Sequence, residues 1–196
     1  MRNNKSKSIE ENGEIRIIAG QWRSRKLLVP NVIGLRPSTN RVRETLFNWL
    51  QFDIANSRCL DVCAGSGALG FEALSRGAQS VHFVEVDPIA TTMIKKNADC
   101  LRANLNETVF VHQTDAISFL SKNAPNESFD FVFVDPPFEL NMHAAIFTAL
   151  LESECLSKNV LIYCEMPSKE SVELPSAWTW YRQKSYKNVT FGLITA

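Results

Sequence analysis

The stretch from residue 131 to residue 138 joins a run of β-forming residues to a carboxylate, two prolines and an aromatic ring. It reads FVFVDPPF, so Asp135 ends a predicted strand and is followed by Pro136, Pro137 and Phe138. Proline lacks an N–H and fixes φ at roughly −65°, which would hold the Asp135 carboxylate and the Pro136 carbonyl as a rigid acceptor pair. Such a pair can accept both hydrogens of an exocyclic amine on a conjugated ring, while Phe138 stacks on that ring. The motif therefore favours group transfer to an amine nitrogen.

A second motif lies between a predicted strand and a predicted helix and reads LDVCAGSGALG. Its residues Gly65, Gly67 and Gly70 fit the pattern G-x-G-x-x-G, which is typical of nucleotide-binding α/β domains. A tight packing corner would give the same pattern. No Lys followed by Ser or Thr comes after the glycines, which excludes a phosphate-binding P-loop.

Acidic residues stand at the ends of four predicted strands, namely Asp61, Glu85, Asp115 and Asp135. Glu85 follows Gly65 by 20 residues, a spacing that would also suit the ribose of a nicotinamide dinucleotide. A dinucleotide, however, carries a pyrophosphate that the other three carboxylates would repel. S-adenosylmethionine carries a sulfonium and an ammonium group instead. We therefore predict that it binds here, with Glu85 accepting hydrogen bonds from the ribose hydroxyls and Asp115 near the adenine.

Strand-like and helix-like stretches alternate through most of the chain. Predicted strands rich in Val, Phe and Ile occupy residues 58–63, 80–86, 108–113, 129–135 and 159–165, and predicted helices occupy residues 67–77 and 88–105. Near-continuous apolar strands suit a parallel sheet that helices cover on both faces. Residues 178–186 and 188–195 resemble a closing hairpin. The predicted fold is α/β, a doubly wound Rossmann-like sheet that is mostly parallel and ends in an antiparallel hairpin.

The N-terminal quarter of the chain is basic. Residues 1–50 carry ten Lys and Arg against four Asp and Glu, although the whole chain has a formal net charge of zero. We predict a disordered polar tail over residues 1–14, a basic extension over residues 15–50 and a catalytic domain over residues 51–196. In the extension, residues 15–20 and 25–30 are predicted strands, and a helix is predicted from about Thr39. The stretch GQWRSRK around Trp22 mixes a ring with cations, a composition suited to nucleic acid.

Composition also limits the compartment and the chemistry. No apolar run approaches the roughly 20 residues of a membrane span, and the first 14 residues lack the apolar centre of a signal peptide. The five cysteines include no C-x-x-C pair, so we expect reduced thiols, no metal site and a cytoplasmic location. The 196 residues, 45% of them hydrophobic, suit one compact domain with a small appendage.

Five stretches of the chain together resemble one methyltransferase family. They read RIIAGQWRSRKL, GLRPSTNRVRETLFNWL, LDVCAGSGALGFEALSRGA, FVEVDP and VDPPF. The glycine loop and DPPF are similar to those of class I S-adenosylmethionine-dependent methyltransferases, including adenine DNA and protein glutamine methyltransferases. With the two N-terminal stretches, the chain from about Ile15 to its end resembles the RsmD family of 16S ribosomal RNA guanine-(N2)-methyltransferases.

The resemblance implies transfer of a methyl group to the 2-amino group of a guanine in 16S rRNA, within an assembled or assembling small ribosomal subunit. We also expect a monomer, and no metal, because the methyl group is already activated on sulfur. It implies that the stretch from Arg36 to Glu44 helps close the cofactor pocket. Ser38 and Asn40 stand where the family more usually has Thr and Asp, and the loss of a charge at Asn40 changes the contacts expected there.

The residues expected at the sites fall into three groups. The catalytic ones are Asp135, Pro136, Pro137 and Phe138. The cofactor-binding ones are Asp61, Ala64, Gly65, Ser66, Gly67, Gly70, Glu85, Val86, Asp115, Ala116, Thr39 and Arg43. The RNA-binding ones are Trp22, Arg23, Arg25, Lys26, Arg36 and Arg41.

Three other functions are compatible with parts of the pattern. An adenine-specific DNA methyltransferase would share the glycine loop and DPPF, but only about 58 residues follow VDPPF, which leaves no room for a sizeable target-recognition segment. A nicotinamide oxidoreductase would share the glycine loop and Glu85. A non-catalytic RNA-binding protein on a similar frame would share the basic extension but would not need Asp135.

Overall fold

The protein is described by a computed structural model that covers residues 11–30, 40–123 and 128–196. Its strands are β1 (Glu11–Arg16), β2 (Lys26–Pro30), β3 (Arg58–Asp61), β4 (Ser80–Glu85), β5 (Val109–Gln113), β6 (Phe129–Val134), β7 (Leu156–Pro167), β8 (Thr179–Tyr186) and β9 (Val189–Thr195). Its longer helices are α1 (Asn40–Trp49), α2 (Ala68–Ser75), α3 (Pro88–Leu101) and α5 (His143–Glu152). Three short helical segments complete it: α4 (Ala116–Ser118), η1 (Phe119–Asn123) and η2 (Phe138–Leu140).

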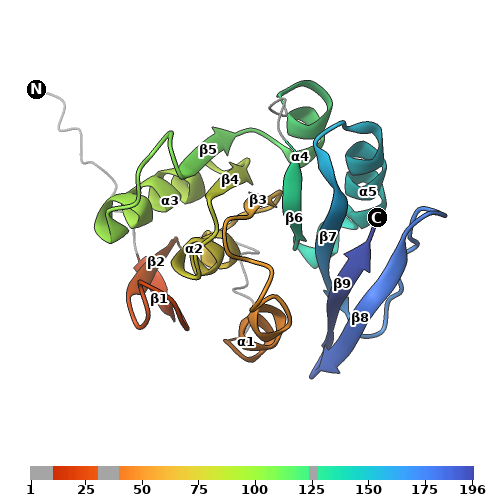
Figure 1. The fold of residues 1–196 in the computed structure, drawn as a ribbon, viewed down its shortest axis with the longest axis horizontal. Coiled ribbons are helices and arrows are strands. Elements are labelled where there is room, and N and C mark those ends of the chain that lie inside the picture. The colour runs from red at the N-terminus through yellow and green to blue at the C-terminus, as the bar shows by residue number, and fades with distance from the viewer. Residues whose placement is uncertain (1–10, 31–39, 124–127) are drawn as a thin grey trace, which may run out of the picture.

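Seven strands form one mixed sheet in the order β5-β4-β3-β6-β7-β9-β8 (Figure 1). The first five strands of that order are parallel, and β9 runs antiparallel to both β7 and β8. From β3 the chain moves outward through β4 to β5, and it then returns to place β6 on the other side of β3. In such sheets ligands bind where the strand order reverses, at the carboxyl ends of the strands. The predicted doubly wound fold with its C-terminal hairpin is confirmed.

Two apolar layers pack against the two faces of the sheet. On one face, side chains of α1, α2 and α3 bury Phe133 of β6 among residues such as Phe47 and Phe71. On the other face, α5 and η1 cover Val132 with residues such as Phe147. These layers hold the strand ends rigidly, and so position the loops that follow them. None of the described helices is both long enough and apolar enough to cross a membrane.

The basic extension differs from its prediction at both ends of its first strand. Residues 11–14 belong to β1, which pairs antiparallel with β2, so they are not part of a tail. Strand pairing uses backbone groups, and polar side chains therefore do not prevent it. The strand ends at Arg16, four residues before the predicted end. Ile15 of β1 and Leu27 of β2 lie in the same core as α1 and α2, so the described part of the extension shares the core of the domain.

Candidate active site

The loop after β3 has the backbone that its glycines allow. Gly65 and Gly67 have φ values of 54° and 77°, in the left-handed region that other residues rarely adopt. Gly67 is the N-cap of α2, so this turn aims the first N–H groups of the helix at the carboxyl edge of the sheet. At Gly70 a Cβ atom would lie 2.2 Å from Cε1 of Phe83, so this glycine is needed for α2 to approach β4. The loop therefore forms a tight turn, and it lies at the point where the strand order reverses.

Glu85 holds that loop from the neighbouring strand. Its Oε2 accepts a hydrogen bond of 2.7 Å from the Gly65 N–H, and its Oε1 accepts one of 2.9 Å from the Asp87 N–H. A carboxylate offers about four acceptor positions, so two remain for a ligand with vicinal hydroxyl groups. Glu85 is partly exposed, and Val86 beside it is 65% exposed, which leaves apolar surface next to the carboxylate. The chemistry of this pair fits a ribose and an attached base.

Asp61 at the end of β3 is a buried carboxylate with an unusual pKa. It is 1% exposed, and its Oδ2 accepts a 3.3 Å hydrogen bond from the Gly70 N–H. Burial, supported by the negative charge of Glu85, raises the pKa of Asp61 to about 7, although the hydrogen bond from Gly70 acts in the opposite direction. A cation bound at this edge would favour its ionised form.

The charges of three of the four predicted acids affect the pKa of one thiol, that of Cys63. Burial raises the pKa of the Cys63 thiol well above its ordinary value, and the charges of Asp61, Glu85 and Asp135 raise it further. The ends of β3, β4 and β6 thus bring these carboxylates around the glycine loop. The fourth acid, Asp115, follows β5, the neighbour of β4, and is exposed. It caps α4 by accepting a 2.9 Å hydrogen bond from the Ser118 N–H, and this bond holds its pKa below the ordinary value.

The DPPF motif leaves β6 at the same edge. Asp135 is partly exposed, Pro136 is buried, and Pro137 is exposed and precedes the short helix η2, in which Phe138 is partly exposed. The Val62 N–H donates a 3.1 Å hydrogen bond to the Phe133 carbonyl, which ties the chain after β3 to β6 just before the motif. An acid, a proline carbonyl and a ring are therefore close to the glycine loop, as their positions at strand ends predict.

Sequence reasoning missed two residues beside Asp135. Glu165 lies near the end of β7 and is 5% exposed, and the Tyr163 hydroxyl donates a 2.7 Å hydrogen bond to its Oε2. Val134 of β6 pairs with Cys164 of β7, so Asp135 and Glu165, each one residue later, lie on neighbouring strands. After burial as the main cause, the negative charges of both acids raise the pKa of Cys164. The rule that singled out acids at strand ends applies equally to the stretch NVLIYCE and would have identified Glu165.

The predicted lid is described only in part. Arg36 and Thr39 lie outside the described residues. Arg43 is fully buried, and its Nη2 donates 2.8 Å hydrogen bonds to the Arg16 carbonyl and to Oδ1 of Asn40. In the described part of the chain, Arg43 therefore joins α1 to the N-terminal hairpin, and its contact with a cofactor stays a prediction. Arg41 is exposed at the start of α1.

The basic turn between β1 and β2 lies away from the DPPF motif. The Trp22 N–H donates to the Ser75 hydroxyl at the end of α2, and Arg25 Nη2 donates a 2.6 Å hydrogen bond to the Cys100 carbonyl near the end of α3. Both helices begin at the carboxyl edge of the sheet. At 1.5 Å per residue, the 14 residues of α3 separate Arg25 from that edge by about 20 Å. Arg23 and Lys26 are exposed in the same region, and their contact with RNA stays a prediction.

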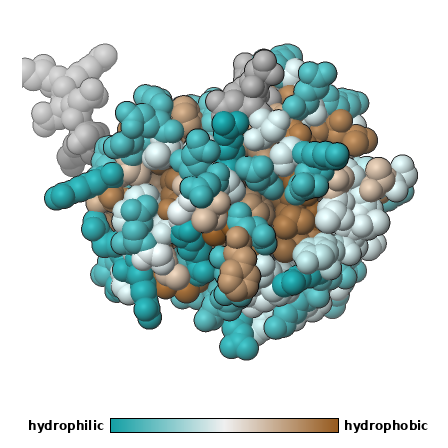
Figure 2. All heavy atoms as spheres, viewed as in Figure 1, coloured by the Kyte–Doolittle hydropathy of each residue, from teal (hydrophilic) through white to brown (hydrophobic). Residues whose placement is uncertain are grey.

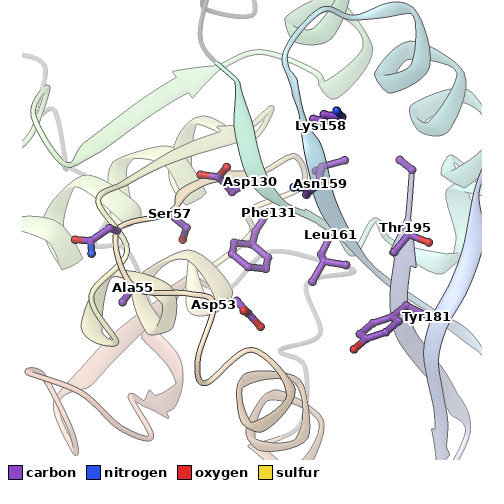
Figure 3. Close-up of a pocket in the computed structure, with 13 residues that line it drawn as sticks. Asp53, Ala55, Ser57, Asp130, Phe131, Lys158, Asn159, Leu161, Tyr181 and Thr195 are labelled. Atoms are coloured by element: carbon purple, nitrogen blue, oxygen red, sulfur yellow. The ribbon is translucent and has the colours of Figure 1, made fainter.

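One cavity among the described residues lies at the opposite, amino edge of the sheet. It has a volume of about 560 Å³ and is lined from the amino ends of β3, β6 and β7 and from the end of β9. Figure 3 shows Phe131 and Leu161 within it and Asp130, Lys158 and Tyr181 around it. In Figure 2 an apolar patch over β6 and β7 is surrounded by more polar surface on this face. None of the residues predicted for catalysis lines this cavity, and its rim carries both signs of charge. We place the chemistry at the carboxyl edge, where the acids and the glycine loop meet.

Comparisons with known proteins show which family this chain resembles. Residues 15–195 match the family model described as Conserved hypothetical protein 95. The chain is 44% identical over 181 residues to Ribosomal RNA small subunit methyltransferase D of Haemophilus influenzae, covering 92% of this chain and 93% of that one. It is 43% identical over 183 residues to the protein of the same name from Escherichia coli K12, covering 92% and 89%. The solved structure of yhhF, a proposed methyltransferase of Escherichia coli, superposes with a TM-score of 0.84 at 40% identity, covering 93% of this chain and 98% of that one.

The fold and the edge site together define a class I S-adenosylmethionine-dependent methyltransferase. The chain belongs to the RsmD family, that of the small-subunit ribosomal RNA methyltransferase D proteins, along nearly its whole length.

Proposed function

We propose that this protein transfers a methyl group from S-adenosylmethionine to the exocyclic 2-amino group of a guanine in the 16S rRNA of the small ribosomal subunit. The observation that carries the proposal is the meeting of two motifs at the ends of adjacent strands. The glycine loop held by Glu85 follows β3, and the Asp135-Pro136 acceptor pair follows β6. The relatives named for methylation of small-subunit rRNA support the choice of substrate.

The site residues fit the cofactor on grounds of shape and charge. Gly65 and Gly67 give the loop after β3 its left-handed turn, and Glu85 can accept hydrogen bonds from two hydroxyl groups. Asp61 and Asp135 would stabilise positive charge on a bound ligand. When bound, S-adenosylmethionine supplies a methyl group that is already activated on sulfur. S-adenosylhomocysteine is the product that this reaction would leave, and no metal is needed for it.

Asp135 and Pro136 act on the amine. The lone pair of the guanine 2-amino group is delocalised into the ring and is a weak nucleophile. The Asp135 carboxylate and the Pro136 carbonyl would each accept one of its hydrogens, which turns the lone pair toward the methyl group. Phe138 would stack on the base after it has left its helix or loop. The buried position of Pro136 supports a rigid acceptor.

The extension has two proposed roles. The residues from Arg36 to Glu44 would close over the cofactor, and Trp22, Arg23, Arg25 and Lys26 would contact the RNA backbone. Because this turn lies about 20 Å along α3 from the carboxyl edge, it would bind a different part of the RNA from the target nucleotide. We propose that the protein does this as a monomer in the cytoplasm, on an assembled or assembling subunit.

The test is nucleoside mass spectrometry of small-subunit rRNA from cells that lack the gene. We expect one N2-methylguanosine per subunit to be lost, and purified protein with labelled S-adenosylmethionine to restore it. Naked 16S rRNA and duplex DNA with adenine targets serve as parallel substrates. Unchanged N2-methylguanosine in the deletion strain, or label transferred only to DNA adenine, would refute the proposed function.

A further inference from the structure

The backbone of the turn between β1 and β2 is fastened to the carboxyl-terminal end of α2 (Figure 1). The Ser75 hydroxyl donates a 2.6 Å hydrogen bond to the Ala19 carbonyl and accepts one of 3.0 Å from the Trp22 N–H. The Ser75 carbonyl accepts a further bond of 2.8 Å from the Gln21 N–H. Ser75 is 3% exposed. A single buried residue of α2 therefore holds the backbone on both sides of the start of the turn.

A buried carboxylate one turn earlier on α2 holds the residues that lead from β1 into the turn. Glu72 is fully buried, its Oε2 accepts a 2.7 Å bond from the Ile18 N–H, and its Oε1 accepts one of 3.1 Å from the Ala19 N–H. Oε1 also accepts a 2.7 Å bond from Arg76 Nε, so a cation balances the buried charge. The proposed chemistry uses neither Glu72 nor Ser75. Both bind backbone groups of the extension, and so they determine where the turn lies.

Gly20 allows the close approach of the turn to α2. Its φ is 83°, and a Cβ atom there would lie 1.8 Å from the Ser75 carbonyl oxygen and 2.7 Å from Ser75 Oγ. No side chain fits between the two segments unless one of them moves. Gly20 is exposed whereas Ser75 is buried, so the turn rather than the helix would move. We call the contact of residues 18–22 with Glu72 and Ser75 the α2 dock.

The α2 dock fixes the distance from the exposed cations of the turn to the carboxyl edge of the sheet. Helix α2 has eight residues and begins at the glycine loop, so its far end lies about 12 Å from that loop at 1.5 Å per residue. Arg25 reaches the end of α3, about 20 Å from the same edge, where it bonds the Cys100 carbonyl. Arg23 and Lys26 are exposed beside it. Rigid helices therefore separate the proposed RNA contacts from the proposed acceptor pair.

We propose that the α2 dock selects the target guanine by distance. The turn binds the RNA backbone at one point, and only a guanine at the matching distance from that point reaches Asp135 and Pro136. The inference rests on the proposed function, since it concerns which guanine that site methylates. Backbone contacts carry no sequence information, but they fix the register of a nucleic acid on a protein. Because a misplacement of about 1 Å can lower a rate by about 100-fold, a fixed turn discriminates between neighbouring guanines. Glu72 and Ser75 are then positioning residues.

Gly20→Ala tests the proposal most directly, because it would push the turn off α2 while keeping every cation. Small subunits from the deletion strain are methylated with labelled S-adenosylmethionine, and each N2-methylguanosine is mapped by nuclease digestion and mass spectrometry. We expect Gly20→Ala to lower the rate at the wild-type target by about 10- to 100-fold and to place label on other guanines as well. RNA affinity and the slope of log K against log salt should stay near the wild-type values, because the phosphate-binding cations remain.

Gly77→Ala is the matched control. Gly77 follows α2 and has a φ of 97°, so alanine is strained there too, but the added Cβ would lie 3.8 Å from Cβ of Ala55, an ordinary contact. This variant should keep the wild-type rate and the single modified guanine. Ser75→Ala removes two hydrogen bonds of the α2 dock without adding an atom, and it should broaden the choice of guanine by a smaller factor than Gly20→Ala. The S-adenosylmethionine affinity of each variant should match that of the wild type.

The outcomes distinguish the two hypotheses. A wild type that methylates no guanine refutes the proposed function, and this inference with it. A wild type active at one guanine, together with a Gly20→Ala protein that keeps both the rate and the single site, overturns only the selection by distance. Equal losses in Gly20→Ala and Gly77→Ala would also overturn it, because they would assign the effect to backbone strain. If Gly20→Ala is unfolded at the assay temperature, Ser75→Ala decides by the same two measurements.

Discussion

The Glu85 carboxylate and the Gly65 N–H, 20 residues apart in the chain, form a hydrogen bond of 2.7 Å. This bond crosses from β4 to the loop after β3 and fixes the floor of the proposed cofactor pocket. Glu85→Ala should therefore weaken S-adenosylmethionine binding by more than tenfold, because it removes both the ribose acceptor and the acceptor for the loop. Isothermal titration calorimetry gives the affinity. Glu85→Gln should not rescue binding, since one of the two backbone N–H groups would then face an amide NH2. Glu152→Ala, at an exposed position in α5, is the control.

The raised pKa of Asp61 predicts how stability changes with pH. The carboxyl has a pKa of about 7 in the folded chain and about 3.9 when unfolded. Below about pH 4 both states are protonated and the stabilising contribution is fully present. As the pH rises from about 4 through 7, the contribution of Asp61 to the free energy of unfolding is lost. In this range the unfolded chain ionises Asp61 freely, whereas the folded chain must keep the buried carboxyl protonated or ionise it at a cost. The wild type should lose on the order of 4 kcal/mol relative to Asp61→Asn between about pH 4 and pH 8. Urea unfolding across that range measures it, and a constant difference between the two proteins would contradict the raised pKa.

The same carboxyl predicts proton release on cofactor binding. A bound sulfonium or ammonium group would favour the ionised form of Asp61. Near pH 6, where Asp61 is mostly protonated, binding of S-adenosylmethionine should release a proton. Titration calorimetry in two buffers with different ionisation enthalpies detects this release. It should disappear in Asp61→Asn, and an equal release in both proteins would assign it to another group.

Asp135→Ala should separate catalysis from cofactor binding. It removes one acceptor for the amine hydrogens, and we expect methyl transfer to fall by about 10²- to 10⁴-fold. The affinity for S-adenosylmethionine should change by less than about tenfold, since Glu85 and the glycine loop remain. Single-turnover methylation of unmodified small subunits gives the rate. Glu139→Ala, an exposed acid four residues later, should retain wild-type activity. Methyl transfer that continued at the wild-type rate in Asp135→Ala would rule out the assigned role.

Gly70→Ala should destabilise the fold despite the better helix propensity of alanine. The added Cβ would lie 2.2 Å from Cε1 of Phe83 and 2.8 Å from Cγ1 of Val81. Phe83 is fully buried against Phe71, with ring centroids 4.9 Å apart, and cannot move freely. Overpacking of this kind costs about 1–3 kcal/mol. Denaturant unfolding of Gly70→Ala, Phe83→Leu and the double variant tests the contact. The double variant should be more stable than the sum of the two single effects, and strict additivity would argue against the clash.

The basic turn should govern RNA affinity rather than the chemical step. Replacing Arg23, Arg25 and Lys26 with Ala should weaken RNA binding and reduce the slope of log K against log salt by about 2 to 3, since each lost phosphate contact removes less than one released counterion. The affinity for S-adenosylmethionine should be nearly unchanged, because the turn lies near the ends of α2 and α3 that are remote from the glycine loop. Filter binding at several salt concentrations provides the slope. An unaltered slope would remove the turn from the RNA interface, and Lys122→Ala on η1 is the single-charge control.

Local patterns were sufficient for much of the fold. The strands from β3 to β7 were predicted because each is a short apolar run with turn residues beside it, and α1 because Val42 and Leu46 repeat at helical spacing. The position of the acids at the carboxyl edge was predicted from the topology of such sheets. Residues 11–14 were misassigned because their polar side chains carry no information about the backbone pairing of Glu14 with Leu28.

Contacts between distant segments were not predictable in the same way. The placement of the basic turn depends on the packing of β2 along α3, where Asn97 Oδ1 accepts from the Leu28 N–H at 2.9 Å. Likewise, His82 and His112 are separated by 30 residues, yet His82 Nδ1 and His112 Nε2 lie 3.1 Å apart on neighbouring strands. Such pairs arise from strand register, which a single sequence does not specify.

The position of β9 between β7 and β8 affects how the chain can fold during its synthesis. Strand β8 leaves the ribosome first, but among the described strands it pairs only with β9, which follows it. Until residues 189–195 emerge from the exit tunnel, β7 presents an unpaired edge and β8 has no place in the sheet. A nascent chain stalled just before β9 would therefore expose two strands with unpaired backbone edges to chaperones and to other nascent chains.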